Sequence, residues 1–123
     1  MSHFTTIKTK LRDMEALSFA LEACGYQTEK SALAKGWYGH TVKADLKASH
    51  ERLKGYDLAF NRIGEELEVT ADWSMIQNSS KIMSEIQQQY ARCVAIGQLE
   101  AAGFSLIEEK QGDQILLTAT RYR

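Results

Sequence analysis

The chain lacks several features that would point to a particular chemistry. Its 123 residues contain no proline and only two cysteines, Cys24 and Cys93. Without proline there is no proline-rich linker, and turns must be formed by Gly, Asn and Asp. No CxxC, HExxH or Cys/His cluster is present, so we expect no metal site. Buried free thiols in a reducing compartment are the simplest interpretation of the two cysteines.

Motifs of catalysis and cofactor binding are missing as well. The sequence has no GxSxG, P-loop or GxGxxG segment, so neither an activated serine nor a phosphate-binding loop is predicted. His3, His40 and His50 lie on separate segments, and no pair has the spacing of helix-borne ligands. The adjacent acids Glu65-Glu66 and Glu108-Glu109 would point to opposite faces of a strand, so neither pair forms a carboxylate dyad. We therefore expect no cofactor and favour a protein that is not an enzyme.

The composition is that of a small globular protein. Hydrophobic residues make up 44% and charged residues 25% of the chain, and the formal net charge is −1. This balance argues against a general polyanion binder and against a polybasic membrane anchor. No apolar run approaches the length of a membrane span, and the first residues lack the pattern of a secretory signal. We expect one α+β domain covering residues 1–123.

A six-residue sequence motif occurs twice and predicts two helix ends. Residues 21–26 read LEACGY and residues 99–104 read LEAAGF. Each copy fits a Schellman motif, in which glycine adopts a left-handed conformation and an apolar residue after it contacts a leucine one turn earlier. We therefore predict that one helix ends at Gly25 and another at Gly103. A duplicated ligand-binding loop is the less favoured interpretation.

Hydrophobic periodicity predicts the element order β-α-β-β-β-β-α-β-β. Two amphipathic helices would pack on one face of an antiparallel sheet, in a ferredoxin-like or similar duplicated β-α-β-β arrangement. The predicted elements are strand 2–11, helix 13–25, a β-like segment from 26 with a turn at 36–39, strand 41–46, loop 47–56, strands 57–63 and 67–73, helix 79–102, and a closing hairpin of 105–110 and 114–122.

Four stretches of the sequence resemble a known family, and they occur in the same order as in that family. The most specific stretch is the opening, MSHFTTIKT. The second stretch is YDLAFN (56–61) with ELEVTAD (66–72). The third is QQQYA (87–91) with Gly-Phe (103–104), and the fourth is GDQILL (112–117) with Arg-Tyr (121–122). They resemble the hypothetical chloroplast reading frame thirty-five family, a plastid and cyanobacterial domain of unknown function.

The resemblance implies a small protein of the cyanobacterial cytosol or the plastid stroma, with no established active site to transfer. A link to photosystem biogenesis is an expectation that comes only from this resemblance. The chain departs from the family pattern around residues 37–54. This departure affects the expected partner surface more than the fold.

Residues 37–54 are also where a partner-binding site is predicted. Trp and Tyr are good interface anchors, and a basic stretch next to an acidic hairpin can steer a charged partner. The predicted anchors are Trp37, Tyr38 and His40, and the predicted steering charges are Lys43, Lys47, Arg52 and Lys54. A core tryptophan beside a bulge and an ordinary solvated loop are the alternatives for the same residues.

We therefore predict a factor that binds an as yet unknown protein partner, in the assembly or regulation of a photosynthetic complex. The alternative is a nucleic-acid-binding module that uses the sheet face and the basic loop 40–54. The interleaved acids disfavour that alternative. An enzyme with a site built across a dimer is a third hypothesis, and pairing of two copies through an edge strand stays open.

Overall fold

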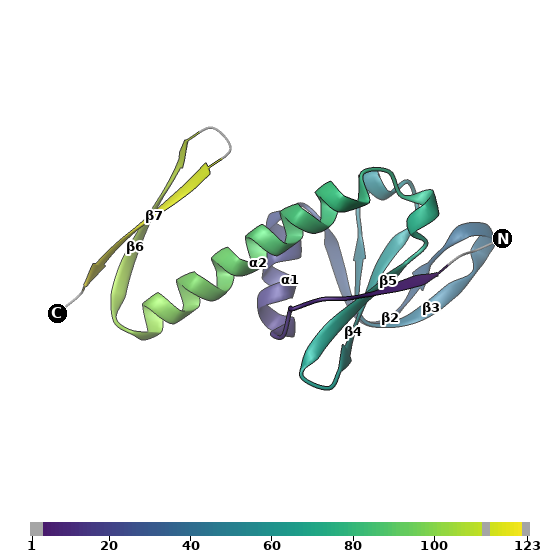
Figure 1. Cartoon of the computed structure of the whole chain (residues 1–123), viewed down its shortest axis with the longest axis horizontal. Coiled ribbons are helices and arrows are strands. Elements are labelled where there is room, and N and C mark those ends of the chain that lie inside the picture. Colours follow the sequence, from purple (N-terminus) through teal and green to yellow (C-terminus); the bar gives the residue numbers. More distant parts are fainter. Residues whose placement is uncertain (1–3, 112–113, 122–123) are drawn as a thin grey trace. The chain divides into compact units, whose positions relative to one another are not determined.

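The computed structural model describes residues 4–111 and 114–121, with side chains from Phe4 to Gly103. It confirms the predicted element order (Figure 1). The elements are β1 (Thr5–Lys8), α1 (Met14–Ala23), β2 (Gln27–Lys35), β3 (Thr41–Ser49), β4 (Asp57–Ile63), β5 (Glu66–Ala71), α2 (Ser79–Ala101), β6 (Phe104–Gln111) and β7 (Gln114–Arg121). Single 3-10 turns cover Trp37–Gly39, Glu51–Leu53 and Trp73–Met75.

The chain forms two compact units, Met1–Tyr90 and Ala91–Arg123. The first unit contains a sheet of order β1-β5-β4-β3-β2 in which every neighbouring pair is antiparallel. The second unit contains the end of α2 and the antiparallel pair β6-β7. The α+β class is confirmed, whereas the ferredoxin-like arrangement is not, because β2 to β5 form an unbroken meander and β1 lies beside β5. The single domain stays a prediction.

The main core lies between this sheet and the two helices. Every second residue of the inner strands faces this core. These residues are Leu46 and Ala48 of β3, Leu58 and Phe60 of β4, and Leu67, Val69 and Ala71 of β5. Leu17 and Leu21 of α1 and Ile82 and Ile86 of α2 pack against them, and each of these side chains is at most 1% exposed. Both helices thus cover the same face of the sheet, as the alternating pattern predicts.

The first predicted helix stop is confirmed in detail. Gly25 has φ +88°, and its N–H donates to the carbonyl oxygen of Glu22 at 3.0 Å. The N–H of Tyr26 donates to the carbonyl of Leu21 at 2.9 Å, and both side chains are buried in the core. At the second stop Gly103 has φ +87° and donates to Glu100 at 3.0 Å. The expected contact of the Phe104 side chain lies outside the described side chains.

Three predicted boundaries were wrong. The strand predicted at 67–73 is β5, which ends at Ala71, and Trp73 begins a 3-10 turn. The first strand is shorter than residues 2–11, and it spans only Thr5–Lys8. Strand β3 continues through Ser49, so the predicted loop 47–56 begins only at His50. The reason is that Ala48, in alternation with Leu46, is fully buried in the core and keeps the chain extended.

Tyr26 offers a test of the core. Its hydroxyl is buried without a hydrogen-bond partner among the described residues, and burial raises its pKa above the ordinary value of 10.0. Because removing an unsatisfied hydroxyl relieves a desolvation penalty, we expect Tyr26→Phe to leave urea stability unchanged or to increase it by about 1 kcal/mol. Above pH 10 the unfolded tyrosine ionises before the folded one. Wild type should therefore lose more stability there than the Phe variant. A clear loss of stability in the variant at pH 7 would contradict this account.

Candidate functional site

The β2–β3 hairpin folds back over the face of the sheet that the helices leave uncovered. Ala59 lies between Leu58 and Phe60 on β4, and both of those side chains face the main core. Ala59 therefore faces the other way. It is nevertheless fully buried, because Ala34 of β2 and Ala44 of β3 pack on it, with Val42 beside them. The outer half of the hairpin thus forms a second, smaller apolar layer.

Two buried carboxylates hold this folded-back half. Asp57, at the start of β4, accepts the backbone N–H of Lys35 at 2.8 Å. Asp72, just after β5, accepts the backbone N–H of Trp37 at 3.1 Å. Their exposed fractions are 5% and 0%. One acid at the start of β4 and one just after β5 therefore each bind the backbone of a hairpin more than 20 residues distant in the sequence.

The second oxygen of each carboxylate is also bonded. Ser49 donates its hydroxyl to Asp57 at 2.8 Å, and Ser74 donates its hydroxyl to Asp72 at 2.9 Å. A buried carboxylate is tolerated only when such donors replace water. The four bonds make the two acids structural acceptors next to the hairpin tip, rather than acids free for catalysis.

The hairpin tip, residues 36–40, is packed on one side and exposed on the other. A Cβ built on Gly36 would lie 2.5 Å from the Phe4 ring, so glycine permits the close approach of the N-terminal segment. On the exposed side, Tyr38 has φ 61° and is 83% exposed. The rings of Trp37 and Tyr38 lie 5.1 Å apart. The tip therefore presents an aromatic pair on a tightly held turn.

The structure brings together only some of the predicted partner-binding residues. Trp37, Tyr38 and His40 share the hairpin tip, and Lys43 follows on β3 with its side chain exposed. Arg52 and Lys54 lie beyond the other end of β3, in and just after the turn Glu51–Leu53.

Two of the predicted steering charges are already paired. Lys47 contacts Glu29 at 3.1 Å, and Arg52 contacts Glu85 of α2 at 2.7 Å. The hydrogen bond to Glu85 raises the pKa of Arg52. These pairings reduce the charge that Lys47 and Arg52 can offer to a partner.

Sequence reasoning missed Asp57 and Asp72. From the sequence they are only two charges of an acidic hairpin, although each stands at the end of an apolar strand pattern. An acid that directly precedes Leu58-Ala59-Phe60 or directly follows Val69-Thr70-Ala71 lies next to the core. That position was the available signal, but it does not reveal which backbone donors the acid meets.

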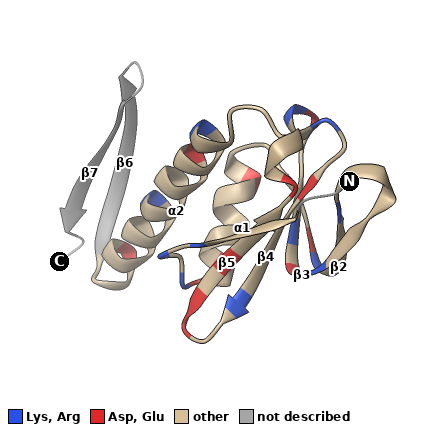
Figure 2. Ribbon diagram, turned by 45° about the vertical axis from the view of Figure 1, so that its right-hand side comes forward, with Lys and Arg blue, Asp and Glu red and all other residues tan. Residues whose placement is uncertain are grey.

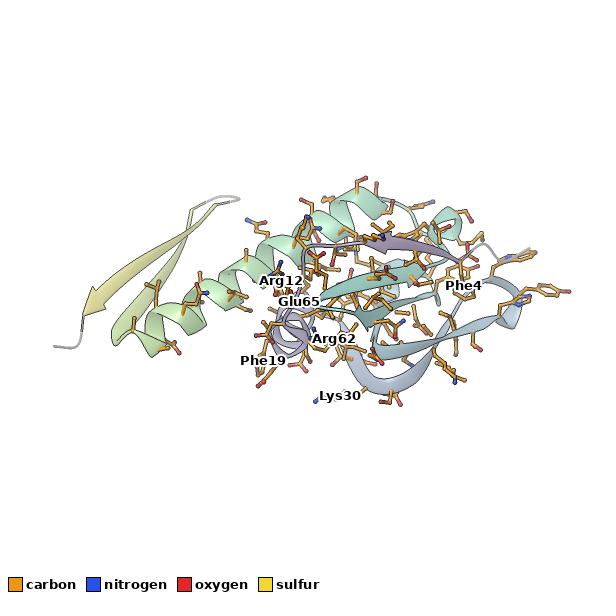
Figure 3. All side chains as sticks on the ribbon, turned by 60° about the horizontal axis from the view of Figure 1, so that its bottom comes forward. Phe4, Arg12, Phe19, Lys30, Arg62 and Glu65 are labelled. Atoms are coloured by element: carbon orange, nitrogen blue, oxygen red, sulfur yellow. The ribbon has the colours of Figure 1, made fainter. Side chains whose placement is uncertain are left out.

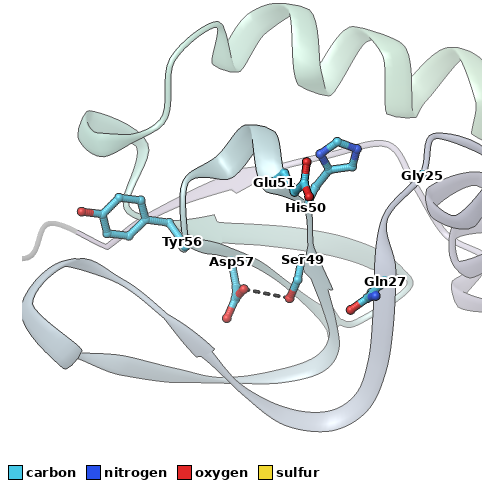
Figure 4. A pocket seen from close by; sticks show the side chains of 8 residues that line it. Gly25, Gln27, Ser49, His50, Glu51, Tyr56 and Asp57 are labelled. Atoms are coloured by element: carbon cyan, nitrogen blue, oxygen red, sulfur yellow. Dashed lines mark hydrogen bonds between the residues drawn. The ribbon is translucent and has the colours of Figure 1, made fainter.

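A pocket of about 570 Å³ opens at the end of β3 (Figure 4). It is lined by Gly25, Gln27, Ser49, His50, Glu51, Gly55, Tyr56 and Asp57. His50 accepts the N–H of Arg52 on Nδ1 at 3.0 Å, and its ring lies 4.9 Å from that of Tyr26. Figure 4 shows Ser49 pointing to Asp57 and His50 pointing away from both. The pocket therefore contains no serine–histidine pair.

Other features of the described chain also bear on the function. Among the described side chains, from Phe4 to Gly103, no group of three or more His, Cys, Asp or Glu residues is arranged to hold a metal ion. In the same residues no helix has the length and apolar character needed to cross a membrane. His3 lies outside the described residues.

Fold and site together define an α+β protein with a meander sheet and an aromatic hairpin tip that is held by Asp57 and Asp72. The chain belongs to the family described as "Protein of unknown function (DUF1257)", whose model matches residues 20–117. A relative from Trieres chinensis, "Uncharacterized protein ycf35", is 30% identical over 114 residues, which cover 90% of this chain and 89% of the relative. Proteins of the same name from Guillardia theta and Cyanophora paradoxa are 27% and 26% identical over the whole chain and 99% of each relative. No solved structure matches the chain significantly. The resemblance to the reading-frame family is thus confirmed.

The two carboxylates Asp57 and Asp72, here called the carboxylate clamp, predict which substitutions lower the stability of the fold. Asp72→Ala removes the acceptor of two donors, the Trp37 N–H and the Ser74 hydroxyl, and we expect a loss of about 3 kcal/mol in urea unfolding. Asp72→Asn keeps one carbonyl oxygen and should lose less. Glu65→Ala is the matched control, because Glu65 is an exposed acid in the β4–β5 turn. Equal stability of Asp72→Ala and the control would show that the clamp does not hold the hairpin.

Proposed function

We propose that this protein is a non-enzymatic binding factor that docks another protein through the hairpin tip. The observation that carries the proposal is Tyr38, which is 83% exposed and has a positive φ of 61°. A non-glycine residue in this region is strained by about 1 kcal/mol or more, and it persists only where its surroundings hold it. Here the surroundings are the clamped residues Lys35 and Trp37.

A rigid exposed aromatic is well suited to bind a partner. Tyrosine and tryptophan dominate binding energies at interfaces, because their rings bury a large area with few rotatable bonds. A turn that is already fixed loses little conformational entropy on binding. The neighbouring ring of Trp37, 5.1 Å from that of Tyr38, limits the positions the tyrosine can take.

The positions of the charged residues reduce the number that we propose as direct contacts with the partner. His40 and Lys43 are exposed next to the aromatic pair and stay proposed as contacts. Lys47 and Arg52 are engaged with Glu29 and Glu85, and Lys54 lies past the far end of β3. We therefore assign these three a secondary, long-range role in steering. The same pairings weaken the nucleic-acid alternative, which needs bases free to neutralise phosphates.

Following the family resemblance, we propose the assembly or regulation of a photosynthetic complex as the setting. The proposed compartment is the plastid stroma or the cyanobacterial cytosol.

A photo-crosslinking amino acid placed at position 38 tests the proposal. We expect one dominant cross-linked partner in extract of the source organism, because the side chain at this position projects from the fixed tip. The same group at Ile63, which is 58% exposed at the end of β4, is the matched control. With the purified partner, Tyr38→Ala should weaken binding about tenfold or more at unchanged stability. Equal cross-linking at both positions, or unchanged affinity of Tyr38→Ala, would refute the tip as the binding site.

A further inference from the structure

We propose that the groove between α1 and β2 binds an extended segment of a partner protein, one that carries a large apolar side chain beside Lys or Arg. The α1–β2 groove is lined by Met14, Glu15, Ser18, Phe19, Glu22, Thr28, Lys30 and Leu46, and its volume is about 650 Å³. This inference deepens the proposed protein-binding function, but it uses a different surface from the hairpin tip.

The groove has one helical wall and one strand wall. Helix α1 supplies residues from successive turns, and the first half of β2 supplies Thr28 and Lys30. The floor is Leu46 of β3, which is 1% exposed and belongs to the main core. An extended segment added along the outer edge of β2 would place its side chains in this groove.

Strand β2 is the end of the described five-stranded sheet. It pairs with β3 on one side, and in the described sheet no strand pairs with its other side. The backbone N–H and C=O groups on an outer edge are the donors and acceptors that an added strand uses. In strand addition, hydrogen bonds to the partner's backbone would supply affinity. Contacts between the groove and every second side chain of the partner would supply specificity.

The apolar part of the groove is incompletely covered. Phe19 of α1 is 58% exposed, although most large apolar side chains of the first unit are buried. Figure 3 shows Phe19 and Lys30 projecting on the same side of the molecule, one from the helix and one from the strand. A leucine or isoleucine of an added strand would cover the Phe19 ring and contact the partly exposed Met14.

The charge of the groove selects a basic partner. Helix α1 carries the acids Glu15 and Glu22 and no basic residue (Figure 2). Among the eight lining residues the only base is Lys30. A neighbouring Lys or Arg on the bound segment would therefore face two exposed carboxylates. A second copy of this chain would bring Glu29 and Lys30 of its own β2 edge, which is a balanced pair of charges rather than the positive charge that the groove favours.

The test is selection of a phage-displayed library of random heptapeptides on the folded chain. We expect enrichment of peptides with a large apolar residue next to Lys or Arg. Binding of an enriched peptide should shift the NMR amide signals of residues 28–30. Methyl groups on alternate peptide nitrogens along one edge should abolish binding, while methyl groups along the other edge should not, as strand addition requires.

Three variants connect the binding to the groove. Phe19→Ser should weaken the selected peptide about tenfold, since it removes the apolar contact. Glu22→Lys lies in the last turn of α1, where a positive charge suits the helix dipole, so the fold is kept. It should weaken basic peptides about two- to fivefold and improve acidic ones. Tyr38→Ala, in the hairpin tip, should bind the peptide like wild type.

Each outcome decides between the two surfaces. Unchanged peptide preference in Glu22→Lys, or enrichment of acidic peptides on wild type, would overturn the groove proposal and leave the hairpin tip untouched. Loss of peptide binding in Tyr38→Ala with full binding in Phe19→Ser would move the site to the tip. A concentration-dependent dimer in sedimentation that Phe19→Ser abolishes would show that a second copy occupies the groove, and it would also overturn the proposal.

Discussion

The arrangement of the first unit depends on hydrogen bonds from the backbone of one hairpin to two buried carboxylates. Asp57 and Asp72 hold the N–H groups of Lys35 and Trp37 at 2.8 and 3.1 Å. Without these acceptors both donors would lose a hydrogen bond to a charged group, at about 1.5–3 kcal/mol each. With them, a hairpin that could extend into solvent instead closes over the second face of the sheet.

The closure has consequences at both ends of the hairpin. At the far end it fixes the turn that presents Tyr38 and Trp37, and it brings Gly36 against Phe4. At the near end, β2 stays beside α1 as the last strand of the sheet, with the groove between them. One face of the sheet is thus covered by the chain's own hairpin, whereas the β2 edge beside α1 stays open to a segment of a partner protein. The tip and the groove are separate surfaces of the same strand pair.

Much of the fold could be predicted because it is encoded locally. The glycine, leucine and aromatic residue around Gly25 specify a helix stop, and the alternation of Val42, Ala44 and Leu46 specifies a strand with one buried face. The short gap between the predicted strands 57–63 and 67–73 indicates a tight turn, and the pairing of Ile63 with Glu66 confirms it.

The site could be predicted only in part, because it depends on contacts between distant residues. The aromatic tip was found from its composition, but Lys47 and Arg52 were predicted as free charges, and their partners Glu29 and Glu85 lie 18 and 33 residues away in the sequence. Asp57 and Asp72 have no local signature beyond their place at strand ends. The groove needs the order of the strands, which hydrophobic alternation does not determine.

Amide hydrogen exchange of the unmodified protein tests the central claim most directly. If the carboxylates hold the hairpin closed, the N–H groups of Lys35 and Trp37 should exchange as slowly as those of the central strand β4, although both donors lie at the end of a hairpin. The N–H of Tyr38, one residue further, should exchange rapidly. Rapid exchange at Lys35 and Trp37, at the rate of an open loop, would contradict the account.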